Sequence, residues 1–445
     1  METFASALKF VLPLFLLLIL IEMVVAKWRN KDVIKSMDVV SSLTSGLTNT
    51  LFKTLGLTVY VFAYDFLLQH FAVFTVQSKA VQYFIGFITL DFYVYWWHRW
   101  RHEYNILWNE HVIHHSSEEY NLPVALRQTI SDIVNPATFL LLPAAIFGVS
   151  LDVIIVLGVV MLFGGFWYHT QLIGKMGFLE KIIVTPSHHR IHHAINPIYI
   201  DKNYGGILII WDKLFGTFQE ELPDIKPVYG ITRPVSTWNP IKINFIHLTL
   251  LTKDAWRTTN VWDKFRIWFM PTGWRPADVA EKFPVHYIND TNKQEKYMPS
   301  VTIYLKVWAW TQLSITFLLL LFLMSQIAVI PKTAVFVYAS FIFLTVYSYT
   351  SLMDRDRTAW LFELVRCAIA FAILYFYGGW FTLNNFLPYG SYILAIYFIA
   401  SASVSIAFEY FEFTPPAVSR RGPCASEAQT AESRGGDSAK GYRPK

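Results

Sequence analysis

The chain has 445 residues, of which 54% are hydrophobic and only 16% are charged, and its net charge at pH 7 is +5. Soluble domains carry about 25% charged residues, so this composition excludes an ordinary soluble protein and favours an integral membrane protein. The small, scattered positive charge argues against nucleic-acid binding and supports at most a weak attraction to anionic lipids.

The N-terminal third predicts three membrane-spanning helices. The first, residues 8–26, is long enough to cross a bilayer. Four basic residues follow it at once and place that end in the cytosol by the positive-inside rule: Lys27, Arg29, Lys31 and Lys35. Further spans are predicted at 47–71 and 81–97. The third span therefore returns to the cytosol and brings His98 to that membrane face.

The next apolar stretch, residues 136–167, predicts a re-entrant or tight helical hairpin. Pro143 and Gly148 interrupt it, and each half is too short for a span of about 20 residues. Both ends should therefore lie on the cytosolic side. Residues 170–300 are rich in charged residues, proline and tryptophan, which predicts a cytosolic cap.

Four more apolar runs predict a C-terminal transmembrane bundle, with the loop 354–357 in the cytosol. The runs cover about 303–330, 333–352, 358–379 and 387–409. The polar composition that follows them predicts a disordered tail. The expected organisation is an N-terminal helix with its basic flank (1–35), a catalytic region with the cap (36–300), the bundle (301–411) and the tail (412–445). The predicted fold class is all-α.

Three histidine clusters are the chemical signal of this sequence. Ten of the 13 histidines lie between positions 98 and 193. The clusters are His98 and His102; His111, His114 and His115; and His189, His192 and His193. Residues three or four apart share one helix face, and neutral imidazole is the commonest ligand of transition metals. With two scattered cysteines and no CxxC, the site must be built from histidine. We therefore predict a pair of metal ions at the membrane surface.

The choice of metal follows from the number of ligands. Catalytic zinc usually takes three protein ligands and structural zinc four, so eight imidazoles exceed the need of two zinc ions. Two near-octahedral irons with open positions use them better. Among the remaining histidines, His169 is a ninth ligand, a hydrogen-bond donor to a ligand, or an ordinary residue at the membrane interface. His188 offers a second reading of the third cluster, of which we favour the one that starts at His189.

Two carboxylates lie close to the first cluster. Asp91 precedes His98 by seven residues, about two helical turns, so both share a face with His102. Ionisable groups within a span usually face a polar interior, and we predict that Asp91 orients a histidine ligand. Glu103 follows His102 directly and could hydrogen-bond a ligand from a neighbouring helix. Its alternative is an exposed charge.

The HxxxH, HxxHH and HxxHH motifs together resemble the signature of the fatty acid hydroxylase superfamily, membrane di-iron enzymes that include sterol desaturases and lipid hydroxylases. The sequence around the motifs, such as "LDFYVYWWHRWRHEYNILWNEHVIHH" and "TPSHHRIHHAINPIYIDKNYGG", is similar to that of the members that cleave alkylglycerol ethers. The resemblance is strong over about residues 40–250. It implies that all eight motif histidines bind two irons and that Glu103 matters for activity.

The same resemblance implies a function. It indicates O₂-dependent hydroxylation of the ether-linked carbon of an alkylglycerol, with tetrahydrobiopterin as electron donor, in the endoplasmic reticulum membrane with the site facing the cytosol. No residue can be named for the pterin. Two alternatives stay open: a sterol or fatty-acyl hydroxylase or desaturase that takes electrons from cytochrome b5, and a zinc-dependent intramembrane hydrolase.

Overall fold

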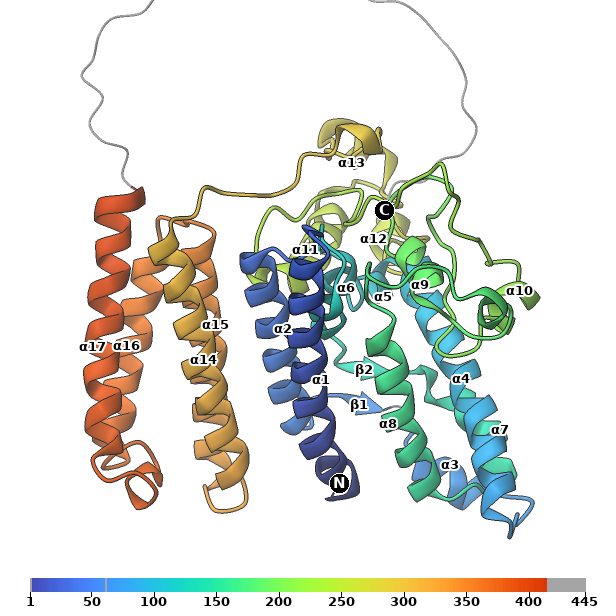
Figure 1. Ribbon diagram of the computed structural model, residues 1–445, viewed down its shortest axis with the longest axis horizontal. Coiled ribbons are helices and arrows are strands. Elements are labelled where there is room, and N and C mark those ends of the chain that lie inside the picture. The colour runs from blue at the N-terminus through green and yellow to red at the C-terminus, as the bar shows by residue number, and fades with distance from the viewer. Residues whose placement is uncertain (1, 61, 414–445) are drawn as a thin grey trace, which may run out of the picture.

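The computed structural model describes residues 2–60 and 62–413. Two groups of roughly parallel helices stand side by side, and a cap of short helices and loops lies over one end (Figure 1). In that view, the cap is uppermost. The predicted all-α class is confirmed, since the strands of the described part are one two-residue parallel pair.

The N-terminal helical group contains the predicted first and third spans. Its elements are α1 (Glu2–Trp28), α2 (Ser36–Thr54), α3 (Tyr64–Phe71), α4 (Lys79–Glu103), α7 (Leu142–Ile146) and α8 (Leu151–Trp167). Both predicted spans form as continuous helices, α1 and α4. The basic residues that follow α1 lie at the cap end of the molecule (Figure 1).

The predicted span at 47–71 is wrong. Helix α2 starts at Ser36 and ends at Thr54, and the chain then forms strand β1 (Val59–Tyr60) before α3. Gly56 has a φ of +66°, a left-handed conformation that glycine adopts without strain and that ends the helix. Ser41, Ser42, Thr44 and Ser45, which precede the predicted span, belong to α2 and are buried.

The predicted hairpin is confirmed as a helix–turn–helix unit. After strand β2 (Val134–Asn135), which pairs with β1, the chain descends through a 3₁₀-helix (Ala137–Leu141) and α7, turns, and returns through α8. The turn uses Gly148 at a φ of +67°, and a Cβ there would lie 2.4 Å from the Phe74 carbonyl oxygen. The hairpin therefore starts and ends on the cap side.

The cap consists of short helices joined by loops. It contains α5 (Asn105–Trp108), α6 (Val112–His115), α9 (Pro186–His192), α10 (Ile210–Leu214), α11 (Pro240–Arg257), α12 (Val261–Arg266) and α13 (Ala277–Lys282), with 3₁₀-helices at Leu122–Leu126, Gly177–Lys181 and Thr291–Lys293. The longest helix, α11, begins with Asn239, whose side chain accepts hydrogen bonds from two free backbone N–H groups. The cap contains the second and third histidine clusters and contacts the first, which lies at the end of α4.

The C-terminal bundle forms as predicted. Its helices are α14 (Ile303–Gln326), α15 (Lys332–Met353), α16 (Ala359–Phe376) and α17 (Gly390–Phe408), which a π-helical turn extends to Phe413. Within the described residues, these four are the helices long and apolar enough to cross a membrane. Helix α4, with Gln82 and Asp91 along its length, is less hydrophobic.

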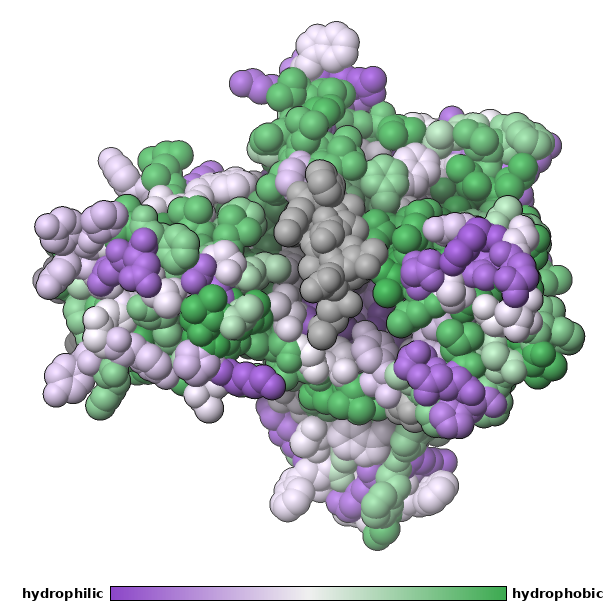
Figure 2. Space-filling model, turned by 90° about the horizontal axis from the view of Figure 1, so that it is seen from below, coloured by the Kyte–Doolittle hydropathy of each residue, from purple (hydrophilic) through white to green (hydrophobic). Residues whose placement is uncertain are grey.

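The bundle is not independent of the rest of the chain. Its largest apolar core contains Met37, Val40, Leu47 and Leu51 of α2 beside residues of α14, α15 and α16. The loop after α15 lies at the cap end, where Asp354 accepts a hydrogen bond from the backbone of Trp238. Seen from the end opposite the cap, hydrophobic side chains cover large areas of both helical groups (Figure 2). Apart from residues 412 and 413, the predicted tail lies outside the described residues.

Candidate metal centre

Nine imidazoles from four segments meet beneath the cap. His98 and His102 lie on the last turns of α4, the second cluster lies in and just before α6, His169 follows α8, and the third cluster lies on and just after α9. The structure therefore brings all eight motif histidines together, and it adds His169 to them.

The imidazoles form two sets. In each set, one ligand nitrogen per residue lies within 4.8 Å of all the others. The five-histidine set is His98, His102, His111, His115 and His192, and the four-histidine set is His114, His169, His189 and His193. Neither set coincides with one sequence motif, because the second and third motifs each contribute to both.

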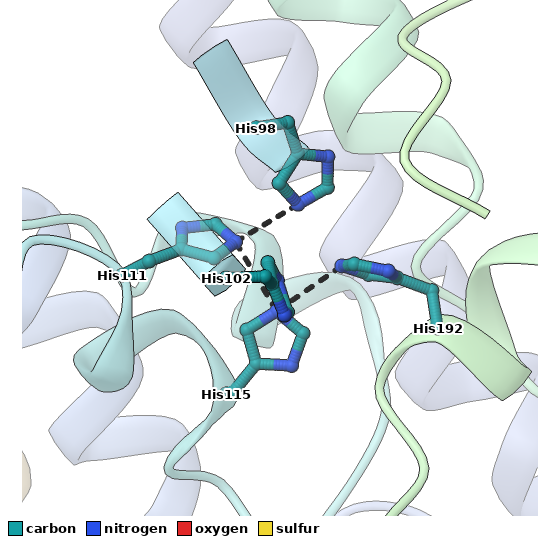
Figure 3. Close-up of side chains that lie close together, drawn as sticks. All are labelled: His98, His102, His111, His115 and His192. Carbon is teal, nitrogen blue, oxygen red and sulfur yellow. Dashed lines mark hydrogen bonds between the residues drawn. The ribbon is translucent and has the colours of Figure 1, made fainter. Parts of the chain in front are cut away.

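The nitrogen–nitrogen distances fit the edges of a coordination shell. In the five-histidine set, Nε2 of His111 lies 2.9 Å from Nε2 of His98 and 3.1 Å from that of His115, and Nε2 atoms of His115 and His192 are 3.1 Å apart (Figure 3). For metal–nitrogen bonds of about 2.1 Å, ligands at 90° are about 3.0 Å apart and tetrahedral ligands about 3.4 Å apart. The observed spacing favours an octahedral arrangement.

The four-histidine set has the same spacing. Nε2 of His169 lies 3.2 Å from Nε2 of His114 and 3.0 Å from that of His189, and Nε2 atoms of His189 and His193 are 3.1 Å apart. His169, whose role the sequence left open, therefore lies at a ligand position between two motif histidines.

Backbone carbonyls fix the orientation of three rings. Nδ1 of each ring donates to a carbonyl oxygen: His98 to Tyr204 (2.9 Å), His114 to Arg127 (3.1 Å) and His192 to Lys202 (2.8 Å). This hydrogen bond leaves the lone pair of a neutral ring on Nε2, the atom that points into its set. The rings are thus prepared to bind a cation.

Hydrogen bonding between the rings cannot account for the five-histidine set. A row of contacts from His98 through His111 and His115 to His192 requires donor and acceptor nitrogens to alternate along it. In a row of four rings, one end would have to be a donor and the other an acceptor. Nε2 is, however, an acceptor in both end members, His98 and His192. At least one contact therefore joins two like groups, and a metal ion at the centre removes that conflict.

Burial keeps the rings neutral and able to bind metal. Desolvation lowers the pKa of His115 and of His192 well below the usual value, and neighbouring histidines lower both further. Both side chains are buried, as are the others of the two sets apart from the partly buried His98. Neutral imidazole is the form that coordinates a metal.

The start of α9 explains why His188 belongs to neither set. Thr185 caps this helix, and Pro186 occupies its first position, where no backbone N–H is needed. The ring of His188 turns back to the cap, where its Nδ1 accepts from the Thr185 backbone N–H at 3.4 Å. Within the described residues, the imidazoles of α9 that join the two sets therefore begin at His189.

Asp91 does not hydrogen-bond a ligand histidine in the described structure. Its carboxylate accepts from the backbone N–H groups of Ile207 and Leu208 and from the indole of Trp211, at 2.7, 3.1 and 2.9 Å. The predicted direct contact is thus replaced by an anchor for the loop before α10. That loop includes Tyr204, whose carbonyl holds His98, so Asp91 acts one step further from the metal.

Glu103 accepts a 2.8 Å hydrogen bond from Arg99. Arg99 also donates to the hydroxyl of Tyr95, which contacts Thr217. Thr217 in turn donates to Asp212. Glu103 therefore belongs to a polar network beside the centre.

Sequence reasoning missed Asp212, the buried end of that network. Its carboxylate accepts from the backbone N–H groups of Tyr204 (2.7 Å) and Gly205 (2.8 Å) and from the Thr217 hydroxyl. It thereby fixes the carbonyl that orients His98. The available signal was weak: a carboxylate between Trp211 and Lys213 in a short helix that follows glycines.

Comparisons with known proteins decide the family. The fatty acid hydroxylase family model matches residues 83–217, which contain all nine imidazoles. The chain is 34% identical to the human alkylglycerol monooxygenase over 89% of this chain and 87% of that protein. It is 33% identical to the Danio rerio enzyme, over 80% of each chain.

The chain belongs to the fatty acid hydroxylase family, in its alkylglycerol monooxygenase group. As a member, it is an oxidoreductase. A bacterial member, the ornithine lipid hydroxylase OlsE of Rhizobium tropici, is 32% identical over 35% of this chain. No solved structure matches the chain. Alkylglycerol monooxygenase similarity covers the C-terminal bundle as well, since a match of 89% extends well beyond the family model.

Proposed function

We propose that the protein is a membrane di-iron monooxygenase that hydroxylates the ether-linked α-carbon of alkylglycerols with O₂ and tetrahydrobiopterin. The observation that carries the proposal is the division of nine imidazoles, eight of them buried, into sets of five and four with nitrogen–nitrogen distances near 3 Å. The names of the relatives supply the substrate class and the monooxygenase reaction.

The residues present fit iron better than zinc. Five nitrogen ligands exceed the four of a structural zinc site, and their spacing matches angles near 90°. When bound, an iron pair would supply the activation of O₂ and would accept the electrons removed from the C–H bond. The chain holds the imidazoles neutral and aims three of them by carbonyl hydrogen bonds.

The overall reaction balances in atoms and electrons. Reduction of O₂ takes four electrons, of which two come from the C–H bond and two from the reduced pterin. One oxygen atom enters the ether-linked carbon, and the other leaves as water with two protons. The resulting hemiacetal breaks its C–O bond to give a fatty aldehyde and glycerol, and the pterin leaves oxidised by two electrons.

Glu103 acts in this proposal as a positioning residue. Its carboxylate fixes Arg99, and the network through Tyr95 and Thr217 ends at Asp212, which holds the loop that orients His98. Loss of the charge should therefore alter the chemical step through the geometry of the five-histidine set.

We place the pterin in a cavity of about 330 Å³, lined by both charged and apolar side chains, between the start of α2, the cap and α14. Small-molecule pockets usually have volumes of about 300–1,000 Å³. Arg127 joins the cavity to the centre, because its guanidinium lines the wall while its carbonyl accepts from His114. A water-soluble reductant can enter here from the cap side, while the lipid stays in the membrane.

The lining of the cavity fits a pterin ring. Glu118 accepts from the backbone N–H of Tyr297 through one oxygen, and in the described structure its other oxygen has no such partner. That oxygen can accept from the amino and ring N–H groups of the pterin. Trp238 and Tyr297, with ring centroids 5.1 Å apart, supply aromatic surface. Burial raises the pKa of Glu118.

Equilibrium dialysis of tetrahydrobiopterin against the purified iron-loaded protein tests this placement. Glu118→Gln should weaken binding at least about tenfold, the effect expected from a lost charged hydrogen bond of about 1.5–3 kcal/mol. Glu295→Gln, in a separate cavity of about 740 Å³, is the matched control and should bind as the wild type does. Unchanged binding in Glu118→Gln would refute the placement.

We also propose an endoplasmic reticulum location with the metal centre facing the cytosol. Lys27 in the last turn of α1 and the three basic residues that follow this helix lie at the cap end, where the positive-inside rule expects the cytosol. Asn289 in the cap begins a glycosylation sequon. In microsomes, it should stay unglycosylated, and a glycan there would invert the orientation.

Aerobic and anaerobic turnover of an alkylglycerol with added pterin tests the reaction itself. Aldehyde should form only with O₂ and only with iron bound. Aldehyde formed without O₂ would exclude a monooxygenase. Activity supported by NADH and cytochrome b5 without pterin would instead identify a sterol or fatty-acyl hydroxylase or desaturase, and bound zinc with no iron would identify a hydrolase.

A further inference from the structure

The cap exposes a group of large apolar side chains around α12, which we call the α12 apolar face. Its members are Trp256 at the end of α11 and Val261, Trp262, Phe265 and Phe269 on α12 and the turn that follows. Their exposed fractions range from 65% to 85%. The opposite side of α12 packs inward through Asp263 and Ile267, which are buried. Exposed aromatic residues clustered in this way mark an interaction surface.

Hydrogen bonds fix the depth of this face relative to the membrane. The backbone N–H groups of Asn105 and Ile106 donate to the carbonyls of Met270 and Trp268, and that of Thr272 donates to the Glu103 carbonyl. The segment after α12 is thus paired with the residues where α4 ends. In Figure 1, α12 lies at the height of the upper end of α4. The face therefore lies level with the end of α4, where the sequence predicts that the chain leaves the membrane.

The face also continues along an exposed aromatic surface beside α4. On α4, Trp100 stacks on Phe139 with ring centroids 6.2 Å apart, and Phe139 is exposed. One turn later, the 40%-exposed Tyr104 forms a β-bridge with Pro271. An apolar strip thus runs from the side of α4 to the turn after α12.

Basic residues accompany the apolar ones. Lys253, Arg257, Lys264 and Arg266 lie on the same two helices. Tryptophan and phenylalanine beside lysine and arginine form the composition of helices that lie in the headgroup region, where aromatic rings enter the acyl boundary and cations meet phosphate. A protein partner would not require this face to lie at membrane depth.

We propose that the α12 apolar face is an interfacial anchor that seats the cap in the phospholipid surface. The anchor holds the cap against the bilayer at the end of α4, directly beside the first histidine motif. Because it requires only that the chain spans a membrane, it can be tested separately from the proposed reaction. Its occupant is the lipid headgroup region and not a second copy of the chain.

The test places a fluorophore on the face in the full-length protein. Phe265→Cys and, separately, Trp262→Cys in a Cys424→Ser background are labelled with an environment-sensitive dye and reconstituted into phosphatidylcholine–phosphatidylserine vesicles. Cys367 is buried within the bundle and should not react. The control is Glu281→Cys on α13, an exposed position at the top of the cap (Figure 1).

Labels on the α12 face should emit to the blue of the control and lose intensity when lipids with a nitroxide near the headgroup are added. The control should do neither. Emission and quenching equal to the control would overturn the proposal. A third outcome is an emission that is blue-shifted but not quenched by nitroxide lipids, with a shift that decreases as the ratio of lipid to protein is raised. This result would overturn the proposal and indicate contact between two copies of the chain. Trp262, Phe265 and Glu281 are exposed, so substitution and labelling there should preserve folding.

Discussion

Replacing Asp212 with asparagine should weaken the five-histidine set without affecting the four-histidine set. The carboxylate accepts from Tyr204 N–H at 2.7 Å through one oxygen and from Gly205 N–H at 2.8 Å through the other. The carbonyl oxygen of Tyr204 accepts a hydrogen bond from Nδ1 of His98. No equivalent link from Asp212 to the four-histidine set exists among the described residues.

The size of the effect follows from these bonds. Asparagine keeps one acceptor oxygen and turns a donor toward the second N–H, so one buried backbone donor loses its partner. An unsatisfied buried donor costs about 1–3 kcal/mol, and a tenfold change in affinity corresponds to about 1.4 kcal/mol. Iron affinity of the five-histidine set should thus fall about 5- to 150-fold, comparable to the 10- to 100-fold typical of residues that support metal ligands.

The assay measures bound iron per protein while free iron is lowered with a chelating buffer. The wild type should hold two irons across a range in which Asp212→Asn holds one. Asp254→Asn is the matched control, because Asp254 is a buried cap aspartate paired with Arg275 and has no bond to the centre. It should lower thermal stability and keep two irons. Equal iron affinity in Asp212→Asn and the wild type would refute the argument.

Three further predictions follow. His192→Ala should remove iron from the five-histidine set, and His193→Ala should remove iron from the four-histidine set. Each variant should lose activity but still insert into the membrane. If the Mössbauer spectra of the two variants lack the signal of the same iron, the division into two sets is contradicted. Glu103→Gln should lower kcat about tenfold with KM unchanged, as expected of a residue that supports the metal site; an unchanged kcat would exclude a positioning role. Burial raises the pKa of Asp212 to about 6, so kcat should fall as the pH drops through about 6, and this decrease should be absent in Asp212→Asn. Because the pKa of Asp212 is higher in the folded than in the unfolded state, protonation of this group favours the folded state. The thermal stability should therefore not fall over the pH range in which kcat falls.

The helices that the sequence predicted well are those whose ends are marked locally. The four runs of the C-terminal bundle have polar or glycine and proline residues between them, such as Pro331 before α15 and Gly390 at the start of α17. The failure at α2 has the opposite cause. Its serines and threonines are buried by packing against other helices, including Thr44 against Tyr349 of α15. A contact between residues 305 apart leaves no local trace in the sequence.

The same distinction explains the metal site. Spacing identified every motif histidine, because residues three and four apart share a helix face whatever the rest of the fold does. Spacing could not tell which imidazoles share an ion. His192 and His193 are adjacent on the chain and belong to different sets, since their side chains leave α9 in different directions. The placement of His169 and of Asp91 likewise depends on how α8 and the loop before α10 meet α4.

The division of the motifs between two sets links the metals to the assembly of the cap. The five-histidine set joins α4, the α6 region and α9, and the four-histidine set joins the α6 region, α9 and the end of α8. A metal ion bound in either set would therefore cross-link segments that are far apart in sequence, and the carbonyls that aim the rings come from loops that those segments position. Because binding to the folded state alone adds to the free energy of unfolding, the cap should be more stable with both irons bound. A ligand deletion would then loosen the cap as well as empty a site, which is why bound iron and activity must be measured together in each variant.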